Sequence, residues 1–67
     1  MNLRKFRVTK RGTKFRYFCN TESDLYHLAF HISVRERGAV YFGENATVDE
    51  LIDDLRGNGY RVEEVAE

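Results

Sequence analysis

The sequence predicts an α+β fold, in which a mostly antiparallel sheet of four or five strands carries one capped helix, residues 47–56, on one face. Three observations predict this class. Segments near both ends alternate apolar and polar residues, as half-buried strands do. Residues 47–56 have helical periodicity behind a capping sequence, and short glycine-containing segments separate the elements. With 67 residues, 42% of them apolar, the chain is expected to form one compact domain, residues 1–67.

The first two predicted strands form a hairpin. Residues 3–9 and 15–19 both alternate, and Arg11-Gly12 lies between them as a place for the chain to reverse. A two-residue loop would pair Val8 with Phe15 and Phe6 with Tyr17, so that apolar residues meet on the inner face. The other face would then carry Lys5, Arg7, Lys14, Arg16 and Phe18.

Residues 21–37 fit two structures. As a strand, residues 26–35 place five apolar side chains in strict alternation, and Arg37-Gly38 would turn the chain into a short strand at 39–43. As a helix, residues 21–37 begin at Thr21, a good N-cap, and end at Gly38, a good C-cap. The strand is preferred because more apolar residues fit its strict alternation than fit the helical spacing. The helical alternative gives the order ββαβαβ.

The C-terminal third contains the capped helix and a last strand. Thr47 and Glu50 have the spacing of a capping box, in which each side chain accepts from the backbone N–H of the other residue. Val48, Leu51 and Leu55 then share one helical face. Arg56 is expected to end the helix, with Gly57 as a left-handed cap and Asn58-Gly59 completing the turn, and a strand is expected from Tyr60 onward.

Charge is strongly segregated along the chain, although the formal net charge is zero. Residues 1–20 hold seven basic residues and no acidic one, whereas residues 44–67 hold eight acidic residues and two arginines. Such blocks predict interaction surfaces. The basic candidate surface, on the hairpin, consists of Lys5, Arg7, Lys10, Arg11, Lys14, Arg16 and Phe18. The acidic candidate surface, on the helix, consists of Asp49, Glu50, Asp53 and Asp54.

These two surfaces predict a small non-enzymatic binding protein that regulates or inhibits a macromolecular partner. The net charge and the pI of about 6.7 favour a protein partner, because proteins that bind nucleic acid are usually basic overall. The alternative is a DNA- or RNA-binding module whose hairpin contacts phosphates while Phe18 stacks on a base. Opposite surfaces could also pair between copies in a homo-oligomer. In size and style the chain resembles compact regulators, including phage-encoded inhibitors.

Other functional classes find no support in the sequence. Gly57-Asn58-Gly59 follows a helix and precedes a strand, the reverse of a phosphate-binding loop, so no cofactor is expected. His27 and His31 could share a metal ion on a helix but not on a strand, and beside them and Cys19 no fourth ligand is evident, so no metal site is expected. No nucleophile stands in a recognisable relation to a base. No apolar run approaches a membrane span, no signal peptide is evident, and the lone cysteine suits a reducing compartment. A cytoplasmic location without membrane contact is therefore expected.

Overall fold

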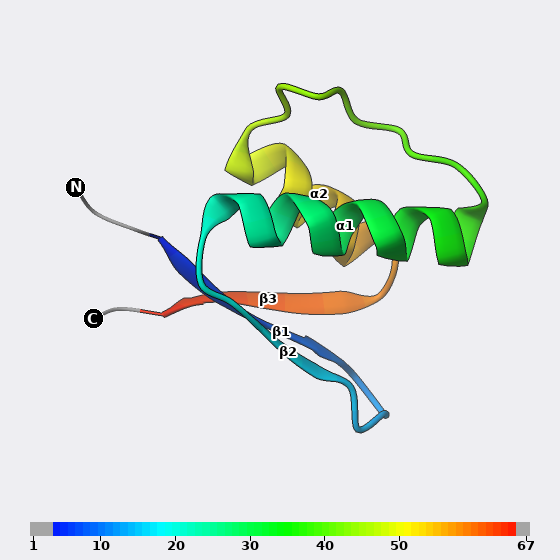
Figure 1. Ribbon diagram of the computed structural model, residues 1–67. Helices are drawn as coiled ribbons and strands as arrows, with labels where there is room; N and C mark the ends of the chain where they lie inside the picture. Colours follow the sequence, from blue (N-terminus) through cyan, green and yellow to red (C-terminus); the bar gives the residue numbers. More distant parts are fainter. Residues whose placement is uncertain (1–3, 66–67) are drawn as a thin grey trace.

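The computed structural model describes residues 4–65 and contains three strands and two helices (Figure 1). In chain order they are β1 (Lys5–Lys10), β2 (Arg16–Cys19), α1 (Glu22–Arg37), α2 (Val48–Gly57) and β3 (Tyr60–Val65). The strands form one antiparallel sheet in the order β2-β1-β3. Both helices lie on the same side of this sheet. The α+β class and the antiparallel sheet are confirmed.

The core lies between the sheet and the two helices. Phe6 and Val8 of the central strand are completely buried, because strands flank them and helices cover their face. Burial of side chains of this size stabilises a fold by about 1.5–3 kcal/mol each relative to exposure. The remaining buried apolar residues are Cys19, Leu25, Leu28, Ala29, Ile32, Val48, Leu51, Leu55, Tyr60 and Val62.

The predicted hairpin register is wrong by two residues. Phe6 lies opposite Cys19 and Val8 opposite Tyr17, so the turn is longer than two residues. An even shift keeps every side chain on its predicted face, because the side-chain period of a strand is two. The longer turn frees Phe15 from the strand, and its ring packs edge-on against Tyr60 with centroids 5.2 Å apart. This contact favours the longer turn.

The preferred strand at residues 26–35 is also wrong: this segment belongs to α1, as the alternative proposed. The Thr21 hydroxyl accepts from the Asp24 N–H at 3.0 Å, and Gly38 ends the helix with φ 75°. Residues 39–43 form no strand, so residues 4–65 contain three strands instead of four or five. The order is ββααβ, which differs from the ββαβαβ alternative by that missing strand.

Helix α2 begins as predicted but ends one residue later: Gly57 is its last residue, and the left-handed conformation expected there occurs at Gly59, with φ 89°. The Glu50 N–H donates to the Thr47 hydroxyl at 3.2 Å, and the Thr47 N–H donates to the Glu50 carboxylate at 3.4 Å, which completes the capping box. Val48, Leu51 and Leu55 are buried against the sheet and α1. Neither helix within residues 4–65 combines the length and the apolar character that crossing a bilayer requires.

Candidate functional site

The sheet has one face that no described helix covers, termed here the open face. Its central row joins Phe18, Arg7 and Glu63 across the three strands, and the next row joins Arg16, Thr9 and Arg61. These side chains point away from the helices because they alternate with the buried residues of each strand. The open face also includes Lys5 and Val65.

The open face combines arginines with an accessible aromatic ring. Phe18 is 44% exposed although it lies in a strand, and the Arg61 side chain is 73% exposed. Arg7 and Arg16 are exposed as well. In the described part of the chain these two arginines have no carboxylate within ion-pair distance, although Glu63 lies across the sheet from Arg7. Their charges are therefore available to a partner.

Three residues of the predicted basic surface lie outside the open face. Lys10 turns toward the helix side, where its Nζ lies 5.1 Å from the centroid of the Tyr60 ring and 3.5 Å from a Glu36 carboxylate oxygen. Arg11 and Lys14 are exposed in the turn between β1 and β2. The predicted basic surface is therefore divided between the open face, the turn and the edge of the core.

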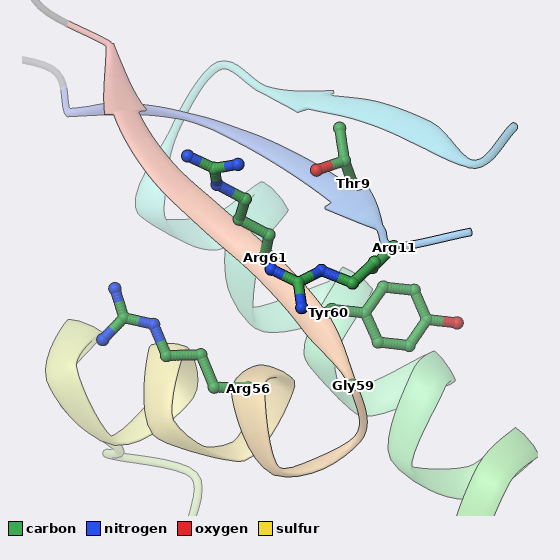
Figure 2. A pocket seen from close by; sticks show the side chains of 6 residues that line it. All are labelled: Thr9, Arg11, Arg56, Gly59, Tyr60 and Arg61. Carbon is green, nitrogen blue, oxygen red and sulfur yellow. The ribbon is translucent and has the colours of Figure 1, made fainter. Parts of the chain in front are cut away.

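The structure adds two arginines that the sequence analysis had counted within the acidic third. Arg56 and Arg61 meet Arg11 around a surface hollow of ≈ 690 Å³, termed here the arginine hollow (Figure 2). Its lining consists of Thr9, Arg11, Arg56, Gly59, Tyr60 and Arg61. The pairing of β1 with β3 brings these segments together, and the charge pattern along the sequence gives no sign of that pairing.

The four residues of the predicted acidic surface occupy different environments. Asp49, Glu50 and Asp53 are exposed on α2, and Glu50 also belongs to the capping box. The Asp54 side chain is only 10% exposed. Its carboxylate accepts from the buried Ser33 hydroxyl and from the Arg37 guanidinium, so it links α2 to α1. The exposed acidic surface therefore consists of three residues on the helix layer, on the opposite side from the open face.

Basic and acidic segments of the sequence meet at one end of the sheet. The Arg4 guanidinium donates two hydrogen bonds to the Glu64 carboxylate, at 2.7 and 2.9 Å. This hydrogen-bonded pair raises the pKa of Arg4 and lowers the pKa of Glu64, because each group stabilises the charged form of the other. At the other end of the sheet, around the turn between β1 and β2, basic side chains gather that have no such two-hydrogen-bond pairing with a carboxylate in the described part of the chain.

The groups considered for metal or redox chemistry lie apart from these surfaces. Cys19 is completely buried, and burial, followed by the charge of Asp24, raises the pKa of its thiol to about 11. Thiol reactivity requires the thiolate, so this environment suppresses it. His27 and His31 are exposed on α1. Residues 4–65 contain no group of three or more His, Cys, Asp or Glu side chains that could hold a metal ion.

An exposed apolar stripe on α1 was not predicted. Tyr26, Phe30 and Val34 follow one another at four-residue spacing on α1. Tyr26 is partly buried against the core, whereas Phe30 and Val34 are 40% and 46% exposed. The loop after α1 partly covers the stripe, because the Phe42 ring packs edge-on against Tyr26 at 5.4 Å. Tyr41 in the same loop remains 68% exposed, with the Arg37 guanidinium 4.8 Å above its ring.

No protein-family model, no curated protein and no solved structure matches this chain.

Proposed function

We propose that this chain is a small non-enzymatic binding protein that docks through its open face on an acidic surface of a protein partner and regulates or inhibits that partner. The observation that carries the proposal is the uncovered sheet face, which presents exposed Arg7, Arg16 and Arg61 together with a Phe18 ring that is 44% exposed. Arginine and aromatic residues are enriched in protein interfaces and among the residues that dominate their affinity.

Two observations support a protein partner over nucleic acid. The open face is mixed in charge, because Glu63 lies directly across from Arg7, and a carboxylate repels a phosphate backbone. The molecule also exposes apolar side chains elsewhere, at Phe30, Val34 and Tyr41, and such patches are typical of protein contacts. The zero net charge adds to this preference.

The acidic surface of α2 provides a second docking surface in this proposal. Asp49, Glu50 and Asp53 belong to the helix layer, so one flat partner cannot contact them and the open face together. They suit a basic region that reaches around the molecule, or the open face of another copy. Contacts of the latter kind are head-to-tail, and they form rings or open chains instead of a symmetric dimer. A cytoplasmic location is part of the proposal, in keeping with the lone thiol.

Nucleic-acid binding is the second candidate function, favoured by the end of the molecule near the turn between β1 and β2. Arg11, Arg16 and Arg56 there make no ion pair with any residue in the described range 4–65. Arginines that track a phosphate backbone, with an aromatic ring for base stacking, are the usual elements of single-strand recognition.

The test is a pull-down from the source-cell lysate, with and without nuclease, followed by mass spectrometry. The Arg7→Gln/Arg16→Gln variant removes two charges from the open face. Arg35→Gln serves as the control, because Arg35 is exposed on α1 and away from the sheet. All three proteins should keep a similar melting temperature, since surface substitutions usually change stability by less than about 0.5 kcal/mol.

We expect the wild type and Arg35→Gln to capture the same protein in the presence of nuclease, and the double variant to lose it. Equal capture by the double variant would contradict docking through the open face. If the partner is captured only without nuclease, the result would favour nucleic-acid binding, the second candidate function, over docking on a protein. A gel-shift titration would then show log K falling with log salt by about 0.9 for each phosphate neutralised on duplex DNA.

A further inference from the structure

The arginine hollow lies where the turn between β1 and β2 meets the turn between α2 and β3. Figure 2 shows its three arginines arising from three different segments around the start of β3. The strands are antiparallel, with Lys10 opposite Tyr60 and Thr9 opposite Arg61, so Arg61 at the start of β3 lies near the end of β1, from which the chain continues to Arg11. The hollow is therefore a product of the β1–β3 pairing.

The turn after α2 completes the hollow. Gly59 has φ 89°, a conformation that favours glycine, and the chain turns there from the last residues of the helix into β3. This places Arg56, in the last turn of α2, beside Arg61. The backbone N–H groups of Asn58 and Gly59 donate to the carbonyls of Asp54, Leu55 and Arg56. These three carbonyls are thus already paired within the turn.

Among residues 4–65, no Asp or Glu lines the hollow, whereas three arginines do. Arg11 and Arg56 have no ion-pair partner within residues 4–65. Arg61 has one, Glu63, at 3.7 Å, but both side chains are largely exposed and Glu63 lies outside the lining. Three like charges with one exposed counter-charge among them repel one another, and a bound anion would offset that repulsion.

We propose that the arginine hollow binds the phosphate group of a small ligand, either free phosphate or a nucleotide. Guanidinium groups present planar pairs of N–H donors that match phosphate oxygens, and hydrogen bonds between charged groups are the strong ones. The Thr9 hydroxyl on the rim adds a neutral donor. The volume of ≈ 690 Å³ falls within the range of about 300–1,000 Å³ typical of small-molecule sites, so there is room for more than a phosphate alone.

This site goes beyond docking on a macromolecule and does not depend on it. The test is an NMR titration of the ¹⁵N-labelled chain with inorganic phosphate and, separately, with ADP. Sodium chloride at equal ionic strength serves as the reference. The signals to follow are the arginine side-chain Nε–H groups and the backbone amides of Gly59 and Tyr60.

We expect saturable shifts confined to Arg11, Arg56, Arg61 and the neighbouring amides. The Arg11→Gln/Arg56→Gln variant should bind at least about tenfold more weakly, because it lacks two charged donors. Lys14→Gln/Arg35→Gln removes the same net charge from residues outside the lining and should bind like the wild type. Equal affinity for phosphate and ADP would identify free phosphate as sufficient, and tighter binding of ADP would identify a nucleotide.

Three results would overturn the site. They are equal shifts with chloride, equal loss of binding in both double variants, and binding of a 5′-phosphorylated oligonucleotide without binding of phosphate or ADP. The last result would assign these arginines to nucleic acid. Because Arg7 and Arg16 lie outside the lining, Arg7→Gln/Arg16→Gln tests docking separately. Failure of one proposal therefore leaves the other intact.

Discussion

At the scale of single residues, Asp54 shows how a charge that is counted as surface can belong to the interior. Its carboxylate accepts from Ser33, which is completely buried, and from Arg37, and so connects α2 with α1. The neighbouring Asp53 has the same chemistry but is exposed. The sequence alone could not separate the two, because both lie on the polar side of the α2 pattern and Ser33 is 21 residues from Asp54.

These adjacent residues give a matched pair for a stability prediction. Asp54→Ala leaves the buried Ser33 hydroxyl without its partner, and it should lower the free energy of unfolding by about 1–3 kcal/mol. Asp53→Ala makes the same chemical change one residue earlier in the helix and should alter stability by less than about 0.5 kcal/mol. Urea unfolding of both variants measures the difference. Equal effects would show that the Asp54 contacts contribute nothing beyond an exposed aspartate.

At the scale of elements, α1 shows why alternation misled the sequence analysis. Leu28 and Ile32 lie on the buried side of the helix, while Tyr26, Phe30 and Val34 form a second stripe, of which Phe30 and Val34 are exposed. Two helical stripes that are offset by two residues produce the same alternation as one strand. The two caps, Thr21 and Gly38, were visible in the sequence and were the better evidence.

The elements that sequence could predict are those whose signals are local. The α2 capping box needs only residues 47–50, and the faces of β1 and β2 need only a period of two. The hairpin register depends instead on Phe15 packing against Tyr60, 45 residues away. The arginine hollow depends on β1 pairing with β3. The shared face of Arg7, Arg16 and Phe18 could therefore be predicted from sequence, whereas the grouping of Arg56 and Arg61 with Arg11 required the topology.

The end of α2 supplies a prediction about backbone conformation. An added Cβ would meet no atom within 4 Å at either Gly57 or Gly59, so only the backbone distinguishes the two positions. Gly59→Ala should destabilise the fold by about 1–2 kcal/mol, because φ 89° is strained for a residue with a Cβ. Gly57→Ala should stabilise it by about 0.4–1 kcal/mol, because Gly57 is helical.

Urea midpoints of the two glycine variants test these opposite signs. A similar destabilisation by both would contradict the helical end at Gly57 or the left-handed turn at Gly59. Because Gly59 lines the arginine hollow, the phosphate titration of Gly59→Ala also reports whether the turn holds the hollow in shape.

At the scale of the whole molecule, a chain of segregated charge folds so that its two ends compensate each other. Arg4 and Glu64 are 60 positions apart in sequence and form a two-hydrogen-bond pair, while Lys5 lies opposite Val65 in the sheet. The other end of the sheet retains the arginine hollow. Zero net charge therefore describes the sum over the chain but not the distribution over its surface.

The Arg4–Glu64 pair should make the folded state less stable as the pH falls into the acidic range. Arg4 lowers the pKa of Glu64 in the folded state below its ordinary value of 4.5. The pair's contribution is therefore present above pH 4.5 and is lost as the pH falls through the lower, folded-state pKa. Glu64→Gln should show a smaller loss of stability over that acidic range than the wild type does.

Side-chain NMR titration of Glu64 measures this pKa directly. We expect a value below 4.5 that moves back toward 4.5 in Arg4→Gln and at high salt, because the pair is exposed and ions screen it. A Glu64 pKa that is the same in the wild type and in Arg4→Gln would contradict the pair.

The central position of β1 in the sheet affects how the chain folds while it is being synthesised. A ribosome makes β1 first among the elements described and β3 last, and it adds roughly 5–20 residues per second. The 50 positions between Lys10 and its partner Tyr60 therefore take roughly 3–10 seconds to synthesise at that rate. During this interval one edge of β1 has no neighbour, and an unpaired edge beside Phe6 and Val8 is a template for aggregation. The sheet can close only after β3 has left the exit tunnel, so a nascent chain stalled before Tyr60 would keep this edge of β1 unpaired.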